Sequence, residues 1–220
     1  QFKVIRDEKS EKLFAFSDEV YFTAWTTTPW TLPSNTALAV GPNITYLEVK
    51  TYNPYTFRPV TIIMAKDRFS AYFNKKAEGI TLEDYKEGDK LIPYQIVAEY
   101  KGPELEGIRY EQLLPWMQPM GDAFRVILGD YVTTEDGNVH IAPTFGADDD
   151  RVAKVAGIAP LQLIDKEGSK QPMVDKRGRL FRMEDIDPEY LKNNVNTDLY
   201  GEFAGRFVKN AYDPNLTENQ

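Results

Sequence analysis

The chain has 220 residues, of which 42% are hydrophobic, and it carries 26 Lys and Arg against 34 Asp and Glu, a net charge of −8. Such a chain can build one sizeable core, but its acidic balance argues against a stand-alone nucleic-acid-binding protein, because such binding depends on neutralising phosphates. Without cysteine there are no disulfides, thiolate metal sites or cysteine nucleophile, and we expect a cytoplasmic chain with no signal peptide or membrane span.

Strand-like patterns occupy most of the first two thirds of the chain. Apolar and β-branched residues bounded by turn formers predict strands over residues 13–25, 45–51, 60–66, 91–100 and 124–134. Asp67 lies where an N-cap would begin a short helix through Phe73. Proline and glycine punctuate residues 102–122, which predicts an extended excursion between two of these strands.

Helical patterns become more frequent toward the end of the chain. A short strand over residues 139–142 is stopped by Pro143, and a helix over residues 148–156 is closed by Gly157. Further turns and helices are predicted at 167–168, 177–178, 189–192 and 198–212. This order predicts an α+β fold with a β-barrel-like core and peripheral helices, formed as one domain over residues 1–220.

The segment from Trp25 to Asn35 has an unusual composition, with four threonines, two tryptophans and two prolines. The prolines do not suit a continuing strand, because each removes a backbone donor. We predict that a strand ends here at a rigid bend and presents hydroxyl groups beside an aromatic wall. If the threonines are extended, Thr26 and Thr28 share one face and Thr27 points to the other.

A second segment, residues 139–150, holds the only histidine of the chain, His140, and three consecutive aspartates. One histidine without cysteine does not make a usual zinc site. The chain has no Gly-x-Ser-x-Gly, Gly-x-Gly-x-x-Gly or P-loop sequence. Hydrolysis by a positioned water is the simplest enzymatic chemistry that remains.

Together, these two segments resemble the editing domain of isoleucyl-tRNA synthetase, the insertion called connective polypeptide 1. Valyl and leucyl relatives continue differently after the threonines and usually lack a histidine at the position of His140. The resemblance covers most of the chain and implies the editing-domain fold of class I synthetases. It also implies no cofactor or metal in this domain, and as partners the aminoacylated acceptor end of tRNA and the rest of a parent synthetase.

The signatures of amino-acid activation, His-Ile-Gly-His and Lys-Met-Ser-Lys-Ser, do not occur in the chain. We therefore expect an editing piece of a larger synthetase without a synthetic active site. Residues 196–220 resemble the segment that leads back toward the catalytic domain of such an enzyme.

The resemblance also implies roles for particular residues. Asp149 would bind the α-ammonium group of the substrate, Thr28 would position ester and water, and His140 would shape the pocket rather than act as a base. The other substrate-binding candidates are Trp25, Thr26, Thr27 and Asn35.

Each candidate also has a purely structural alternative, which the residues themselves leave open. Three aspartates at a helix start are good caps, and threonines suit strands. His140 has the alternative of a buried histidine satisfied by a backbone partner. Trp25 has the alternative of a core residue, and Asn35 that of a turn cap.

Two further features stand beside these motifs. The family pattern has Asp-Gly-Thr-Gly before Val-His, whereas Asp136-Gly137-Asn138 leads here directly to Val139, so this loop is shorter. The main basic cluster consists of Lys176, Arg177, Arg179 and Arg182. A solvated hairpin turn is the alternative to a functional surface for this cluster.

The resulting hypothesis is post-transfer editing, the hydrolysis of the ester of valyl-tRNA specific for isoleucine, with valyl-adenylate as an additional candidate substrate. One alternative is a non-catalytic module that binds the tRNA acceptor end. Another is the editing domain of a valyl or leucyl relative.

Overall fold

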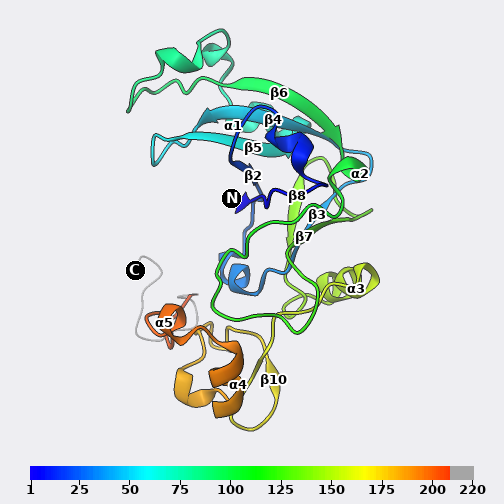
Figure 1. The fold of residues 1–220 in the computed structure, drawn as a ribbon, viewed down its shortest axis with the longest axis vertical. Helices are drawn as coiled ribbons and strands as arrows, with labels where there is room; N and C mark the ends of the chain where they lie inside the picture. Colours follow the sequence, from blue (N-terminus) through cyan, green and yellow to red (C-terminus); the bar gives the residue numbers. More distant parts are fainter. Residues whose placement is uncertain (209–220) are drawn as a thin grey trace. The chain divides into compact units, whose positions relative to one another are not determined.

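The computed structural model describes residues 1–208 (Figure 1). The chain divides into two compact units. The first unit comprises Gln1–Trp25, Leu38–Glu111 and Arg125–Val139. The second comprises Thr26–Ala37, Gln112–Phe124 and the chain from His140 onward. The single domain over 1–220 and the returning segment over 196–220 stay predictions, and residues 209–220 lie outside the described part.

The first unit contains a five-stranded sheet, drawn in the upper part of Figure 1. Its members are β1 (Phe2–Lys3), β2 (Val20–Phe22), β4 (Thr45–Tyr52), β5 (Pro59–Ala65) and β6 (Gln95–Lys101). They lie in the order β1-β2-β5-β4-β6; β2 and β5 are parallel and the other neighbours antiparallel. Apolar side chains from β4 and β5 pack against Phe69 and Phe73 at the short helix α1 (Phe69–Tyr72).

The second sheet consists of β3 (Ala37–Val40), β7 (Arg125–Leu128) and β8 (Asn138–Ile141), in the order β7-β3-β8. All four residues of β3 are buried, as expected of a central strand with a continuous apolar run. The helix α2 (Gly102–Leu105) follows β6 directly. The division between the two units falls within β3 and β8, so His140 belongs to the second unit.

The second unit combines short helices with a two-stranded hairpin. Its elements are α3 (Ala147–Ala156), β9 (Leu163–Ile164), β10 (Lys170–Gln171), α4 (Pro188–Asn194) and α5 (Thr197–Tyr200). Their core contains Trp116, Tyr190 and Tyr200 among other buried apolar residues. The excursion over residues 102–122 is therefore more than an extended connection, because it supplies Trp116 to this core.

Several predicted elements are confirmed with their end signals. Gly157 ends α3 in the left-handed conformation at φ +70°, which glycine adopts without steric cost. The Asp187 side chain accepts a hydrogen bond from the Tyr190 amide at the start of α4. Both predicted turns place a glycine, Gly168 or Gly178, at positive φ.

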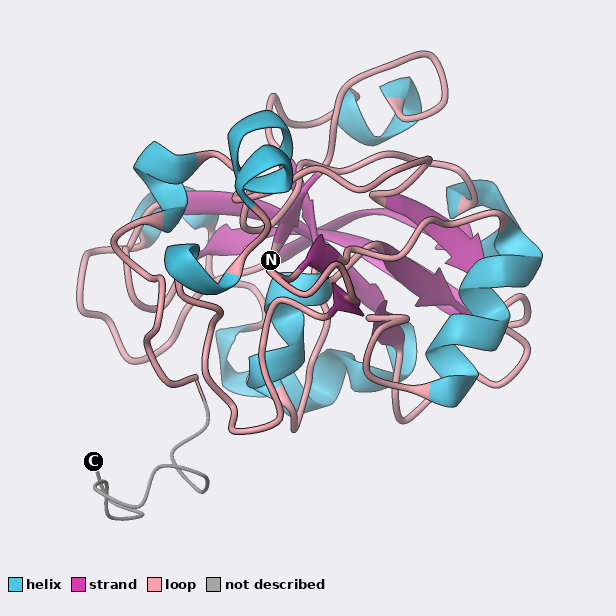
Figure 2. Cartoon of the chain, turned by 90° about the horizontal axis from the view of Figure 1, so that it is seen from below, coloured by secondary structure: helices cyan, strands magenta, loops and turns pink. Residues whose placement is uncertain are grey.

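The predicted fold class is confirmed as a mixture of sheets and short helices. Loops, drawn in pink, connect these elements over a large part of the chain (Figure 2). Within residues 1–208 the strands form separate open sheets rather than a closed barrel.

Other predicted boundaries are wrong for local reasons. The strand expected over residues 13–25 shrinks to β2, because residues 11–14 form a 3₁₀ turn that buries Leu13 and Phe14. Asp67 makes no cap, because its 3₁₀ turn runs straight into α1. β6 begins only at Gln95, after Pro93, which has no backbone donor.

Two elements near the unit boundary and the chain end are also shorter than predicted. The strand over residues 124–134 ends at Leu128, where the chain enters a turn closed by the Val132 amide and the Gly129 carbonyl. The helix over residues 198–212 is observed only as α5, after which turns follow to residue 205 and Phe207 forms an isolated β-bridge with Arg179. The remaining residues of that prediction lie outside the described part.

Candidate functional site

The threonine-rich segment bends where its prolines predict. The strand β2 ends at Phe22, and a 3₁₀ helix over Pro29–Ser34 follows Thr28. Proline suits the first position of a helix, because the missing amide has no partner to lose there. The Thr31 amide closes the first turn by donating to the Thr28 carbonyl at 3.0 Å.

Three threonine hydroxyls form a connected row within this bend. The Oγ1 atoms of Thr26 and Thr28 lie 3.2 Å apart, and those of Thr28 and Thr31 lie 3.3 Å apart. Thr31 Oγ1 also donates to the Thr28 carbonyl at 2.8 Å. Thr27 is exposed instead, which confirms that Thr26 and Thr28 share a face that excludes it.

His140 joins this row through one ring nitrogen and Asn35 through the other. Its Nε2 lies 2.8 Å from Thr31 Oγ1, and its Nδ1 lies 3.1 Å from Asn35 Nδ2. The Asn35 amide nitrogen also donates to the Ala37 carbonyl at 2.9 Å, which fixes the orientation of the amide. Because an amide nitrogen only donates, Nδ1 accepts, and the neutral ring carries its proton on Nε2.

The protonation state of His140 follows from its burial. The residue is only 9% exposed, and burial lowers the pKa of His140 to about 4, because the charged imidazolium loses its hydration. The neutral ring donates from Nε2 to Thr31, whose own proton goes to the Thr28 carbonyl. Both ring nitrogens are thus engaged, which suits a positioning role better than that of a free base.

Asp149 lies in the first turn of α3 and is half-buried. Its Oδ2 accepts a hydrogen bond from the Ala142 amide at 2.8 Å. Burial raises the pKa of Asp149, and the hydrogen bond from Ala142 partly opposes this. None of the three aspartates caps α3 through a side-chain hydrogen bond, because the N-cap residue is Gly146. In this respect the capping alternative is wrong.

The neighbouring aspartates have different roles. Asp148 and Asp150 form ion pairs with Arg151 and Lys154 on the surface of α3. Only Asp149 of the three turns its carboxylate back to the loop that follows β8. The contacts of Asp149 therefore differ from those of its two neighbours, while its role in binding an ammonium group stays a prediction.

Trp25 is 65% exposed and belongs to the first unit. The core alternative for this tryptophan is therefore wrong. Trp25 lines a cavity of about 220 Å³ together with Arg68, Tyr72 and other residues of the same unit. In the short loop beside it, Gly137 has a φ of +73°, and the Asn138 side-chain amide donates to the Thr23 carbonyl at 2.7 Å.

The second unit therefore links four of the predicted residues by hydrogen bonds between side chains. A fifth, Asp149, forms its hydrogen bond with a backbone amide nearby. The hydrogen-bonded set consists of Thr26, Thr28, Asn35 and His140. Asp149 binds the backbone two residues beyond His140. Sequence reasoning missed Thr31, the link in this set, although its position three residues after Thr28 at a proline-started helical turn was an available signal.

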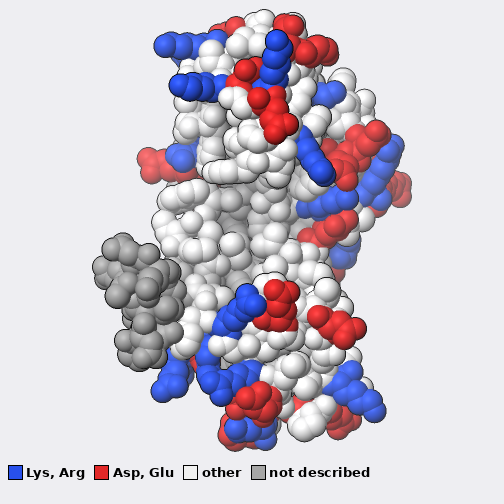
Figure 3. Space-filling model, turned by 90° about the vertical axis from the view of Figure 1, so that its left-hand side faces the viewer, with Lys and Arg blue, Asp and Glu red and all other residues white. Residues whose placement is uncertain are grey.

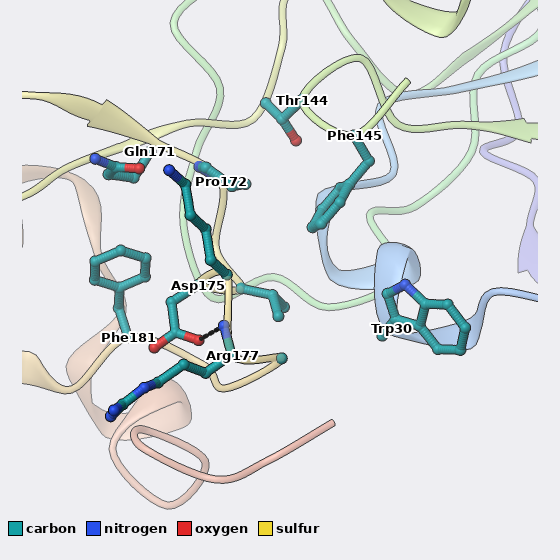
Figure 4. Close-up of a pocket in the computed structure, with 11 residues that line it drawn as sticks. Trp30, Thr144, Phe145, Gln171, Pro172, Asp175, Arg177 and Phe181 are labelled. Atoms are coloured by element: carbon teal, nitrogen blue, oxygen red, sulfur yellow. Dashed lines mark hydrogen bonds between the residues drawn. The ribbon is translucent and has the colours of Figure 1, made fainter. Parts of the chain in front are cut away.

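A cavity of about 690 Å³ lies in the same unit and was not predicted (Figure 4). Trp30 and Phe145 line one part of it, and Gln171, Pro172 and Phe181 line another. The turn that begins at Asp175 completes the lining. Thr28, His140 and Asp149 are not among its lining residues.

Within residues 1–208, no helix has both the length and the apolar character needed to cross a bilayer. In the same part of the chain, no cluster of three or more His, Asp or Glu side chains is arranged to hold a metal ion.

Comparison with a solved structure places the fold. The chain resembles a crystal structure described as GlLeuRS-CP1, with a TM-score of 0.50 and 17% sequence identity, over 71% of this chain and 62% of that one. At this identity the likeness concerns the fold alone, and it defines the fold class as that of a synthetase CP1 domain. No protein-family model matches the chain.

Comparison with curated sequences identifies the family. An isoleucine–tRNA ligase of Bacteroides fragilis is 62% identical over 200 residues, which is 90% of this chain and 18% of that protein. An isoleucine–tRNA ligase of Porphyromonas gingivalis is 54% identical over 221 residues, 99% of this chain and 19% of that protein. The chain belongs to the isoleucine–tRNA ligase family, and it spans less than a fifth of the length of these relatives.

Proposed function

We propose that this chain carries out editing within an isoleucine–tRNA ligase by hydrolysing the ester of valyl-tRNA specific for isoleucine. Valyl-adenylate is the second substrate that we propose for the same site. The observation that carries the proposal is the half-buried carboxylate of Asp149 in the same unit as the hydrogen-bonded row from Thr26 to His140. The proposed partners are the aminoacylated acceptor end of tRNA and the rest of the parent synthetase.

The need for such a reaction follows from the size of the two amino acids. Isoleucine and valine differ by one methylene group. A single methylene group gives a binding pocket only about 1–3 kcal/mol of discrimination, and this pair is the standard example of that limit. A second site that excludes the larger side chain and hydrolyses the smaller ester multiplies this selectivity.

We assign the α-ammonium group of the valyl ester to Asp149. Within residues 1–208 the hydrogen bonding of this carboxylate involves Oδ2 alone, so Oδ1 is available to an ammonium donor. A charge-assisted hydrogen bond of this kind is short and strong and fixes the direction of the ester. The positive charge of the ligand also favours the ionised carboxylate, against the effect of burial.

We assign the positioning of water and ester to Thr28. Its hydroxyl stands between those of Thr26 and Thr31, and His140 holds Thr31 from the other side. The hydroxyl row therefore has a set direction before the substrate arrives, which reduces the reorganisation needed for reaction. His140 acts in this scheme as a positioning residue.

The proposed reaction is a simple hydrolysis that needs no cofactor. Water attacks the carbonyl carbon of the valyl ester, and the bond from this carbon to the ribose oxygen breaks. The ribose oxygen takes up one proton and leaves as the free hydroxyl of the tRNA, while valine leaves as the free acid. Much of the acceleration is expected from holding water and ester together.

The test uses the parent synthetase with Asp149→Ala and Asp149→Asn. We expect both variants to lose at least tenfold in the hydrolysis of valyl-tRNA, because an interaction of about 1.4 kcal/mol or more with the ammonium is removed. Formation of isoleucyl-tRNA is the internal control, since its active site lies outside this chain. Hydrolysis at the unchanged rate in both variants rejects the assignment of Asp149.

A second measurement separates catalysis from mere binding. The wild-type parent enzyme is expected to hydrolyse valyl-tRNA faster than isoleucyl-tRNA. If it instead binds both esters and hydrolyses neither, the chain is a binding module for the acceptor end and the proposed function is wrong.

A further inference from the structure

The cavity of about 690 Å³ in the second unit has the size of a ligand site. Three separate segments of the unit line it (Figure 4). Trp30 comes from the turn that follows Thr28, Thr144 and Phe145 come from the loop between β8 and α3, and the remainder comes from residues 171–181. The cavity thus borders the sequence segments that carry Thr28 and Asp149.

Two cations of the lining are not neutralised within the described chain. Lys176 and Arg177 are exposed, and no ion pair within residues 1–208 includes either side chain. The neighbouring Asp175 accepts from the amides of Arg177 and Arg179 with Oδ1 and pairs with the Arg179 guanidinium through Oδ2 at 3.3 Å. Its charge is therefore balanced by Arg179.

These two exposed cations lie in a chain of net charge −8. On the face shown in Figure 3, basic and acidic side chains are largely interspersed. At the cavity, Lys176 and Arg177 stand without a carboxylate partner among residues 1–208. The local charge is therefore suited to a phosphate group.

Aromatic side chains and a buried hydroxyl accompany these cations. Phe145 is 38% exposed, and Trp30 and Phe181 also line the cavity. The Thr144 hydroxyl is buried and has no hydrogen-bond partner within the described residues. Aromatic faces beside unneutralised cations are the combination by which proteins bind single-stranded nucleic acid without reading its sequence.

We propose that this cavity binds the single-stranded nucleotides of the tRNA acceptor end that precede the aminoacylated one. Lys176 and Arg177 contact their phosphates, and Phe145 provides a face on which a base stacks. The inference rests on the proposed function, because the terminal nucleotide must reach Asp149 for the preceding ones to reach this cavity. Lys176 and Arg177 are thereby positioning residues for the tRNA ester.

The test compares two substrates in the parent synthetase carrying Lys176→Gln together with Arg177→Gln. With valyl-tRNA we expect about a tenfold rise in KM and little change in kcat, because the phosphates are no longer neutralised while the reacting group is untouched. With valyl-adenosine, which lacks the preceding nucleotides, we expect no change. The dependence of log KM on log salt should weaken by about 0.7 for each phosphate that the variant no longer binds.

Matched variants control for charge and folding. Lys166→Gln together with Lys192→Gln removes the same charge from positions that do not line the cavity, and we expect no change with either substrate. Lys176→Arg together with Arg177→Lys keeps the charge and should keep the KM for valyl-tRNA. Phe145→Ala should raise that KM about fivefold or more because the stacking face is removed, and Phe145→Tyr should retain it.

The outcomes separate this inference from the proposed function. If Asp149→Ala abolishes hydrolysis of both substrates but the Lys176 and Arg177 double variant leaves the KM and salt dependence of valyl-tRNA unchanged, the cavity inference is wrong and the function stands. If the double variant hydrolyses valyl-tRNA and valyl-adenosine with equally reduced kcat/KM, the inference is also overturned, since this result indicates a general structural effect. If the wild-type enzyme hydrolyses neither substrate, the proposed function itself fails.

Discussion

Burial moves the pKa values of His140 and Asp149 in opposite directions. In both cases the charged form loses hydration, so the pKa of His140 falls to about 4 and that of Asp149 rises. Neutral His140 keeps the hydroxyl row in one hydrogen-bonding direction. Protonation of His140 would place a second donor against the Asn35 amide, which also donates.

A pH dependence of stability follows from His140. Its folded pKa of about 4 lies below its unfolded value near 6.5, so the folded state binds fewer protons between these pH values. The contribution of His140 is fully present above pH 6.5 and is lost as the pH falls toward 4. We expect about 3 kcal/mol of unfolding free energy to be lost over this range, measured by urea denaturation.

The control for this prediction is His140→Gln, which removes the only imidazole of the chain. Carboxylates also titrate in this range, and burial raises the pKa of Glu48 as well, so the difference between the two proteins isolates His140. The imidazole proton signal should titrate near pH 4 in NMR spectra. A midpoint near 6.5 would contradict the buried, doubly bonded state of His140.

Thr31 offers a second prediction for single residues. Thr31→Val keeps the shape but removes the hydroxyl that accepts from His140 Nε2 and donates to the Thr28 carbonyl. We expect a loss of about 1–3 kcal/mol, because buried polar groups are left without partners. Thr31→Ser should retain most of the stability in the same denaturation measurement, and equal losses for both would exclude the hydroxyl as the cause.

Among the elements, α3 matters most for the proposed site, because its first turn carries Asp149 and a glycine ends it. Gly157 lies at φ +70°, and its amide donates to the Ala153 and Lys154 carbonyls. Nothing lies within 4 Å of the position that a Cβ atom would occupy. A substitution there therefore tests backbone conformation without a steric clash.

We expect Gly157→Ala to lower the unfolding free energy by about 1 kcal/mol, since alanine is strained at positive φ. Gly157→Asn should cost less, because asparagine tolerates this conformation better. Thermal unfolding of the three proteins checks the order. Alanine and asparagine variants of equal stability would contradict the left-handed end of α3.

Elements with strong local signals could be predicted from the sequence. Gly157 marks the end of α3 correctly, and the apolar pattern finds β4 and β5 to within about a residue. The prediction of a strand over residues 13–25 was wrong over most of its length, because an apolar pattern does not distinguish an extended strand from a 3₁₀ turn that buries Leu13 and Phe14.

At the scale of the whole molecule, the family and the fold class could be predicted because two short segments carry specific patterns. The division into two units could not, since it depends on contacts between residues distant in sequence, such as those that bury Trp116 beside Tyr200. The link from Thr28 through Thr31 to His140 was hidden for the same reason, because 109 residues separate its last two members.

We propose that Asp149 and the hydroxyl row of Thr26, Thr28 and Thr31 form one site for the aminoacyl end of tRNA. The most direct test of this claim is a crystal structure of the parent synthetase with a non-hydrolysable valyl-adenosine analogue. We predict the α-ammonium group at about 2.7–2.9 Å from the Asp149 carboxylate, with the acyl group beside Thr28. An analogue bound elsewhere, with Asp149 contacting only Ala142, would contradict the claim.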